Sequence, residues 1–198
     1  MSLGKPAHAP ISAIVKIVAE NQNEGMQMAE VGAFCGQTTK TYIDIISKNN
    51  GKLYIVDWFK GNIGAVGYHA YREDIDTVYN TFTQNIKGYI DCVEILRGKT
   101  HDMIQHIPDK SLDICFIDAD HTYPFVKKDI DLAIPKIKSG GILCGHDLEN
   151  FDKVDFTDQE LNSDFTDGRH CGVIRAVYEK FGTDVNLHTD TVWSKIIE

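Results

Sequence analysis

Short apolar runs alternate along this chain with longer segments in which apolar residues recur every three or four positions. The runs predict strands near 26–32, 52–57, 92–96, 112–117 and 142–144. Helical spacing predicts helices near 37–48, 69–86, 100–106, 123–134 and 171–181, and two terminal strands follow near 184–188 and 191–197. Alternation of this kind predicts an α/β fold that is Rossmann-like and doubly wound. We expect a mostly parallel seven-stranded sheet with helices on both faces.

Three segments fall outside this alternation. Residues 9–22 carry Ile11, Ile14, Val15 and Val18 at helical spacing, which predicts an N-terminal helix over the edge of the sheet. Residues 58–68 are rich in glycine and aromatic residues and predict a loop. Residues 147–168 are rich in Asp and Glu and predict a long acidic loop. The length suits one domain over residues 1–198.

Charge and composition exclude several classes of function. The formal net charge is −9 and no basic stripe is evident, so we expect neither nonspecific nucleic-acid binding nor attraction to an anionic membrane. No apolar run approaches the roughly 20 residues needed to cross a bilayer, and no signal peptide is evident. The five cysteines form no C-x-x-C pair. They predict buried thiols in a reducing compartment, and therefore a cytoplasmic protein.

The block from Glu30 to Thr38 carries the first candidate chemistry. It turns from a strand into a helix through Gly32 and Gly36. Glycines let a backbone approach a ligand closely, and the helix start offers free N–H groups. Asp57 ends the next apolar run, where a carboxylate can bind the two hydroxyls of a ribose. Phe34 stands where a dinucleotide site needs its second glycine, which argues against an NAD(P)-dependent oxidoreductase.

Two further blocks place polar residues directly after apolar strands. Asp118 and His121 follow one strand, and His146 and Asp147 follow the next. Helix capping or a solvated loop start would explain such residues without any chemistry. Two converging carboxylates, however, repel each other unless a proton or cation joins them, and Mg²⁺ or another divalent cation prefers oxygen ligands. A histidine beside them has the ordinary pKa of a general base.

Together these motifs resemble class I S-adenosylmethionine-dependent methyltransferases, in the branch of the catechol and caffeoyl-CoA O-methyltransferases. The combination of Asp118, His121 and the His146–Asp147 pair is most similar to related small bacterial O-methyltransferases and cephalosporin-hydroxylase-like proteins. The resemblance covers roughly residues 26–147. It implies that S-adenosylmethionine is held by Glu30, Gly32, Phe34, Gly36, Thr38, Asp57, Trp58, Thr100, His101 and Asp118.

The chain departs from the catechol-type pattern at two positions. Where that family usually has a lysine base, this chain has His121. Where that family has an Asp-Asn pair of metal ligands, this chain has Asp147 and Leu148, and His146 precedes them. The resemblance therefore implies His121, Asp118 and Asp147 as catalytic residues. A metal site, if one is formed, would use Asp118, Asp147 and His146.

The expected function is methyl transfer from S-adenosylmethionine to a hydroxyl of a small molecule or sugar. His121 would act as the base, and Asp118 and Asp147 would hold a divalent cation or the acceptor. A module that binds the cofactor without transfer, or a hydroxylase-like enzyme on the same fold, are alternatives. We expect residues 58–72 and 147–170 to form the acceptor pocket. An exposed N-terminal helix would suit a homodimer.

Overall fold

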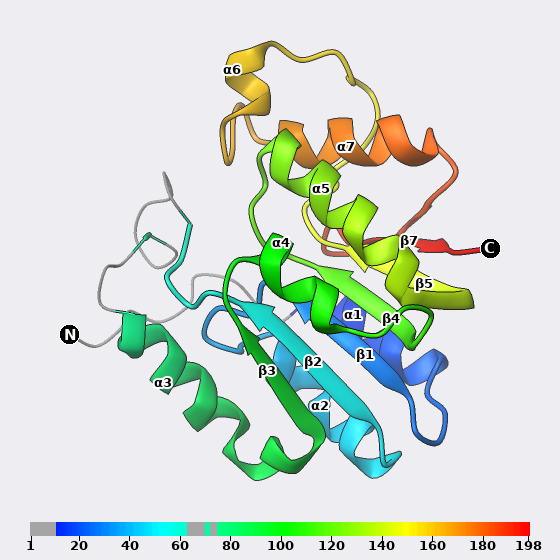
Figure 1. Ribbon diagram of the computed structural model, residues 1–198. Coiled ribbons are helices and arrows are strands. Elements are labelled where there is room, and N and C mark those ends of the chain that lie inside the picture. Colours follow the sequence, from blue (N-terminus) through cyan, green and yellow to red (C-terminus); the bar gives the residue numbers. More distant parts are fainter. Residues whose placement is uncertain (1–10, 63–69, 72–74) are drawn as a thin grey trace.

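The computed structural model describes residues 11–62, 70–71 and 75–198. It contains a seven-stranded sheet in the order β3-β2-β1-β4-β5-β7-β6 (Figure 1). The strands are β1 (Gln27–Val31), β2 (Lys52–Asp57), β3 (Val93–Arg97), β4 (Leu112–Ile117), β5 (Ile137–Gly145), β6 (Asn186–Leu187) and β7 (Trp193–Ile196). Strands β1 to β5 are parallel and β7 is antiparallel to both neighbours. The predicted Rossmann-like, mostly parallel sheet is confirmed.

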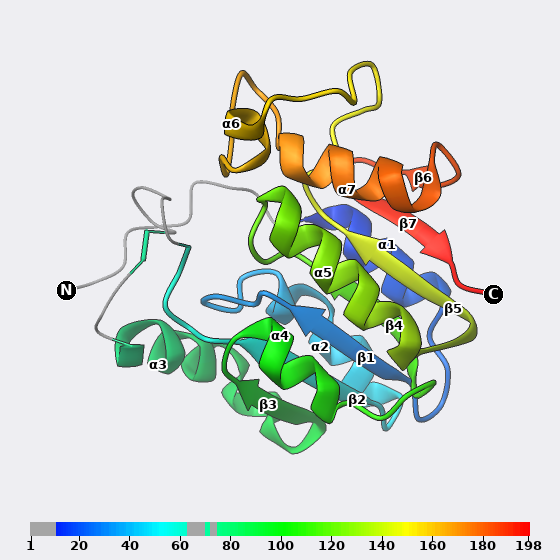
Figure 2. The ribbon, with the colours of Figure 1, turned by 45° about the horizontal axis from the view of Figure 1, so that its top comes forward.

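Helices cover both faces of this sheet, as predicted (Figures 1 and 2). One face is covered by α1 (Ser12–Glu20), α2 (Thr39–Lys48) and α3 (Ile75–Ile86). The other is covered by α4 (Thr100–Met103), α5 (Tyr123–Ala133) and α7 (Cys171–Phe181). Short 3₁₀ turns occupy Lys87–Cys92, Ile104–His106 and Ile134–Lys136. Each face therefore has its own apolar core, with the sheet between them.

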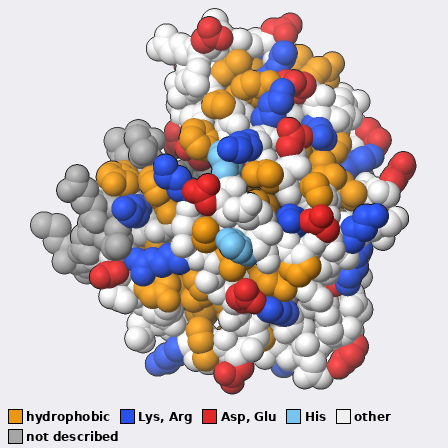
Figure 3. All heavy atoms as spheres, in the orientation of Figure 1, with side chains coloured by type: hydrophobic (Ala, Val, Ile, Leu, Met, Phe, Trp, Pro, Cys, Tyr) orange, Lys and Arg blue, Asp and Glu red, His pale blue; other side chains and the backbone are white. Residues whose placement is uncertain are grey.

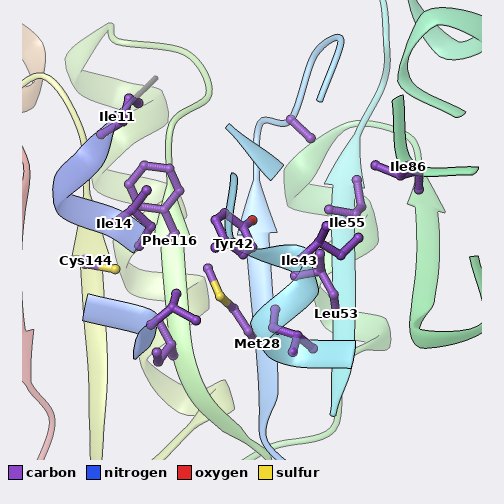
Figure 4. Close-up of a cluster of buried hydrophobic side chains, with 14 of the residues drawn as sticks. Ile11, Ile14, Met28, Tyr42, Ile43, Leu53, Ile55, Ile86, Phe116 and Cys144 are labelled. Atoms are coloured by element: carbon purple, nitrogen blue, oxygen red, sulfur yellow. The ribbon is translucent and has the colours of Figure 1, made fainter. Parts of the chain in front are cut away.

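The N-terminal helix lies on a face of the sheet and not over its edge. Ile14 of α1 is fully buried in the same cluster as Tyr42 of α2 and Phe116 of β4 (Figure 4). The apolar side of α1 is thus used within the chain, and the homodimer stays a prediction. Residues 9 and 10 of the predicted helix lie outside the described residues.

Several predicted boundaries were wrong for local reasons. β5 begins at Ile137 and runs through Gly140 and Gly141, because its register with β4 shifts between Leu112 and Ile114. β6 has only two residues. Cys92 ends a 3₁₀ turn instead of starting a strand. All five cysteines are free thiols; four are buried, as predicted, but Cys92 is only half-buried. Residues 63–69 and 72–74, within the predicted loop and helix start, lie outside the described residues.

The acidic segment after β5 is mostly loop, as predicted. It contains one short helix, α6 (Asp158–Leu161), which begins with a capping box between Thr157 and Glu160. Figure 1 shows this segment in yellow and orange, beside α7. Among the described residues, no helix is long and apolar enough to span a bilayer. Acidic and basic side chains are interspersed on the face shown in Figure 3, without a continuous basic stripe on that face.

Candidate active site

The site lies at the carboxyl ends of the central strands. β1 has β2 on one side and β4 on the other, so chain connections diverge at this point of the sheet. Ligands of doubly wound sheets bind at such a switch point. Val31 of β1 is in register with Ile117 of β4, and Ile117 with Gly145 of β5. The polar residues that follow these strands are therefore brought to one edge of the sheet.

The glycine turn after β1 is shaped by close contact with β4. Gly32 and Gly36 have positive φ angles of 88° and 74°, and Phe34 has one of 46°. A Cβ atom on Gly32 would lie 2.1 Å from the carbonyl oxygen of Asp118. Only glycine can therefore pass the end of β4 at this point. The predicted role of Gly32 in a turn is confirmed, and its contact with a cofactor stays a prediction.

Asp57 fixes the same turn from the end of β2. Its Oδ2 accepts backbone N–H bonds from Ala33 at 2.8 Å and Phe34 at 2.6 Å, and its Oδ1 accepts one from Phe59 at 2.5 Å. Burial raises the pKa of Asp57 above its ordinary value, although these N–H groups oppose the shift. A carboxylate has about four acceptor positions, so Asp57 keeps capacity for ribose hydroxyls.

Glu30 is sealed inside the protein. It has no exposed surface, and its Oε2 accepts hydrogen bonds from Thr39 at 2.5 Å and Tyr42 at 2.6 Å. Its Oε1 has no hydrogen-bond partner among the residues that the structure describes. Burial raises the pKa of Glu30 to about 8, so the group is mostly neutral at pH 7. A contact with the methionine end of a cofactor would require Oε1 to become accessible.

The remaining predicted cofactor residues lie around the same edge. Trp58 donates its indole N–H to the carbonyl of Gly61 at 3.0 Å. His101 instead faces α5, because its Nε2 is 3.1 Å from Asp129 Oδ1 and its ring stacks on Phe125 at 5.3 Å. Thr38 and Thr100 stand at the starts of α2 and α4. Their proposed contacts with the cofactor stay predictions.

The catalytic residues predicted from the two strand ends do come together. Asp147 Oδ2 lies 3.1 Å from both His121 Nε2 and His146 Nδ1. Asp118 Oδ1 lies 3.5 Å from His146 Nδ1 and 3.7 Å from His121 Nε2. Each of the four side chains is less than a quarter exposed. Two carboxylates and two imidazoles thus share one largely buried cluster, which we call the strand-end cluster (Asp118, His121, His146 and Asp147).

Three residues of the segment between β5 and α7 extend the strand-end cluster. Asp164 Oδ1 lies 2.8 Å from His121 Nδ1. Glu149 Oε1 lies 2.8 Å from His170 Nδ1, and that nitrogen is 3.5 Å from Asp147 Oδ1. The rings of His121 and His170 meet edge to face at 4.7 Å. All three residues belong to the segment 147–170 that is expected to border the acceptor pocket, but no sequence motif assigns a role to any one of them.

The electrostatics of the strand-end cluster favour protonated histidines and ionised aspartates. Burial disfavours the imidazolium of His121, but Asp118, Asp147 and Asp164 outweigh it and raise its pKa well above the ordinary value. The balance is similar at His146, whose pKa is raised to about 10. Burial likewise opposes ionisation of Asp118, yet both histidines hold its pKa at about 2. Some cation, either protons on the histidines or a bound ion, must therefore accompany the two carboxylates.

Two close contacts hold the loop that carries His121. Asp120 Oδ1 accepts hydrogen bonds from the backbone N–H of Thr122 at 2.8 Å and its hydroxyl at 2.6 Å, which closes a local turn just before α5. The N-cap residue of α5 is Thr122, and no side-chain cap hydrogen bond is formed there among the described residues. The start of α7 presses on the same loop. A Cβ atom on Gly172 would lie 2.2 Å from the carbonyl oxygen of His121. Gly172 therefore allows α7 to approach the backbone of His121.

Comparisons with solved structures agree with this fold. A candidate O-methyltransferase from Klebsiella pneumoniae is 14% identical, with a TM-score of 0.65 over 98% of this chain and 84% of that chain. A candidate caffeoyl-CoA O-methyltransferase from Staphylococcus aureus is 15% identical, with a TM-score of 0.62 over 96% and 83%. A candidate rRNA methylase from Clostridium thermocellum is 12% identical, with a TM-score of 0.63 over 98% of both chains. At such identities the likeness shows the fold alone.

Two comparisons of the sequence gave different results. A search of the curated proteins found no match. The profile of a family described as "Methyltransferase domain" matches residues 29–148, which is more than half of the chain and includes the glycine turn and the strand-end cluster. The chain therefore belongs to this methyltransferase domain family, whose members use S-adenosylmethionine.

Proposed function

We propose that this protein transfers a methyl group from S-adenosylmethionine to a hydroxyl oxygen of a small molecule. The observation that carries the proposal is the strand-end cluster, which places a histidine and two carboxylates beside the glycine turn at the switch point of the sheet. When bound, the cofactor supplies a methyl group on a sulfonium, ready for attack by a nucleophile. The protein contributes mainly by holding the two reactants in line, which can lower the barrier by several kcal/mol.

The cofactor would lie across the ends of β1 and β2. The turn from Gly32 to Gly36 offers its backbone, and Asp57 faces the ribose. The residues that would complete this side are Glu30, Phe34, Thr38, Trp58, Thr100, His101 and Asp118. The fit is good at Asp57, since the carboxylate is already held beside the turn. The fit is poorest at Glu30, which faces α2, and at His101, which faces α5.

His121 would take the proton of the acceptor hydroxyl. Its Nδ1 is bonded to Asp164, which fixes the orientation of the ring and leaves Nε2 toward the strand-end cluster. A histidine oriented by a carboxylate is the arrangement of many general bases. The neighbouring carboxylates raise the pKa of His121 well above its ordinary value, so the ordinary histidine pKa expected from the sequence is wrong. Near neutral pH, only the minor fraction of the protein with His121 unprotonated at Nε2 can act in this way. Because the single proton of that hydroxyl goes to His121, Asp118 and Asp147 would accept hydrogen bonds from other donors of the acceptor and stabilise the imidazolium that forms.

The class of acceptor is proposed from the net charge of the chain and from the names of the similar structures. Two of the similar structures are named as O-methyltransferases, and a third is named as an rRNA methylase. The net charge of −9 opposes phosphate contacts, so a small hydroxyl compound or sugar is favoured over RNA. The segment 147–170 contacts the strand-end cluster through Asp164 and His170. This segment would therefore form one wall of the acceptor pocket.

The test is a transfer assay with a panel of catechols, other phenols and sugars, read out as formation of S-adenosylhomocysteine. We expect turnover with at least one hydroxyl acceptor, and a loss of about 100-fold or more in kcat for His121→Ala. The control is His106→Ala, because His106 is exposed outside the site. Full turnover by His121→Ala would contradict its role as base. Tight cofactor binding without product from any acceptor would favour a binding module.

The oxygen-only magnesium site of the catechol-type enzymes does not fit these residues. The position that should supply an amide oxygen is Leu148, which is 1% exposed and packs in the core. The neighbouring donor is a nitrogen, His146 Nδ1. Mg²⁺ prefers oxygen ligands in near-octahedral geometry. No step of the proposed reaction is therefore assigned to magnesium.

A further inference from the structure

The strand-end cluster contains a compact set of possible metal ligands. One ligand atom each from Asp118, His146 and Asp147 lies within 4.8 Å of the others. His146 Nδ1 is the common point, since it is 3.5 Å from Asp118 Oδ1 and 3.1 Å from Asp147 Oδ2. Neighbouring ligands of one ion with bonds of about 2.1 Å are about 3.0 Å apart at right angles and about 3.4 Å apart in a tetrahedron. The two distances from His146 Nδ1 are close to these spacings.

The backbone holds these donors in place before any ion binds. The N–H of His146 donates to the carbonyl of Ile117 at 3.1 Å, and the N–H of Leu148 donates to the carbonyl of Thr191 at 2.9 Å. Asp147, between them, has a φ angle of +61°. A non-glycine residue in this region is strained and often marks a functional position. The two flanking hydrogen bonds therefore hold the backbone on either side of Asp147.

The chemistry of the donors selects among cations. The set consists of two carboxylates and one imidazole, and a second group that shares Asp147 adds His121 and His170. Any ion beside Asp147 thus meets nitrogen donors. Imidazole suits Zn²⁺, Fe²⁺, Co²⁺ and Ni²⁺, whereas Mg²⁺ prefers carboxylates, carbonyls and water. The charge of a divalent ion would also balance the two buried carboxylates.

We propose that Asp118, His146 and Asp147 bind one first-row transition metal ion in preference to Mg²⁺. The proposal deepens the proposed function and rests on the same site. His146 takes the place of the amide ligand that Leu148 cannot supply. The other explanation of the short distances is a set of ion pairs between protonated histidines and the carboxylates, and a metal titration separates the two.

The experiment is a titration of the metal-free full chain at pH 7.5 with Co²⁺, followed by visible absorption, and with Zn²⁺ and Mg²⁺, followed by calorimetry. We expect one equivalent of Co²⁺ to give ligand-field bands. We expect affinities for Co²⁺ and Zn²⁺ to exceed that for Mg²⁺ by about 100-fold or more. His146→Ala should weaken Co²⁺ binding by about 10-fold or more. His146→Asn, which offers an amide oxygen, should narrow the difference between Co²⁺ and Mg²⁺.

The matched control is His106→Ala, which removes an exposed imidazole outside the site and should bind Co²⁺ as the parent does. Three results would each overturn the proposal: no saturable Co²⁺ binding, Mg²⁺ binding as tight as Co²⁺ binding, or unchanged Co²⁺ affinity in His146→Ala. Binding of S-adenosylhomocysteine is measured on the same samples. If it binds while the metals do not, only the metal inference fails; if the metals bind and it does not, the proposed function fails.

Discussion

Asp164 lies 43 residues after His121 in the chain, yet its Oδ1 is 2.8 Å from the Nδ1 of that histidine. The pair joins the acidic segment after β5 to the loop after β4. The acidic segment is thus more than a solvated surface, because one of its carboxylates fixes the ring of the proposed base. The partner on the other nitrogen is Asp147, 3.1 Å from Nε2. His121 is therefore held between two carboxylates of the acidic segment, one before α6 and one after it.

Removing the charge of Asp164 should slow turnover without weakening cofactor binding. In Asp164→Asn the amide can no longer serve as an anionic acceptor for His121 Nδ1, so the ring loses its fixed tautomer and orientation. We expect kcat to fall by about 10- to 100-fold, with the Kd for S-adenosylhomocysteine changed less than about 3-fold. Steady-state kinetics and calorimetry would measure the two quantities. Asp167→Asn, an exposed neighbour in the same segment, is the control; equal kcat in both variants would contradict the role of Asp164.

A substitution at Asp57 should weaken cofactor binding as well as lower stability. It anchors the turn that carries Ala33 and Phe34, and it is the proposed ribose ligand. We expect Asp57→Asn to raise the Kd for S-adenosylhomocysteine by about 10-fold or more, because the amide turns a donor toward backbone N–H groups. Calorimetry on the folded variant would measure this change.

The matched control for Asp57 is Asp113→Asn. Asp113 also accepts a backbone N–H bond, from Gln27 at 2.7 Å, but it lies at the opposite edge of the sheet, at the start of β4. Both variants should lose stability, while only Asp57→Asn should lose cofactor binding. Equal cofactor binding by the two variants would exclude Asp57 from the cofactor site.

The sequence predicted the parts of the site that follow directly from strand ends. Gly32, Asp57, Asp118 and Asp147 each come one or two residues after an apolar run or at its end, and parallel strands bring such positions to one edge. Their convergence could therefore be inferred from local pattern alone. The same logic predicted the sheet and its helices, because burial on both faces of parallel strands gives continuous apolar runs.

The sequence could not predict what the segment after β5 does. Asp164 and His170 reach the strand-end cluster only because this segment folds back over α7, and no periodic pattern encodes such a path. The direction in which a side chain points could not be predicted from the sequence either. Glu30 and His101 stand at the predicted edge, yet Glu30 points toward Tyr42 and His101 toward Asp129. Those directions depend on partners from α2 and α5.

Gly172 should be essential for the position of the His121 loop. A methyl group at this position would lie 2.2 Å from the His121 carbonyl oxygen and 2.3 Å from the Tyr123 nitrogen, both backbone atoms. We expect Gly172→Ala to lower the free energy of unfolding by about 2 kcal/mol or more, or Tm by about 4–8 °C. Gly88→Ala is the control, because no atom lies within 4 Å of the added Cβ. Similar melting temperatures for the two variants would show that α7 does not press on this loop.

Glu30 should make the protein less stable as the pH rises. Its pKa is about 8 in the folded protein, because burial disfavours the carboxylate, and close to 4.5 when unfolded. Between these values the folded state binds more protons than the unfolded state, so the free energy of unfolding falls with pH. The stability that neutral Glu30 provides is fully present below about pH 4.5 and is lost as the pH rises through about 8.

Glu30→Gln removes this titration while keeping a neutral group that can accept hydrogen bonds from Thr39 and Tyr42. Urea unfolding from pH 5 to pH 9 should therefore show the variant gaining on the parent by an amount of the order of a few kcal/mol, with no further gain well above pH 8. Glu20→Gln, an exposed carboxyl on α1, is the control and should track the parent. A constant difference between Glu30→Gln and the parent at every pH would mean that Glu30 ionises in the folded protein as it does in the unfolded chain, and that its burial beside α2 carries no cost.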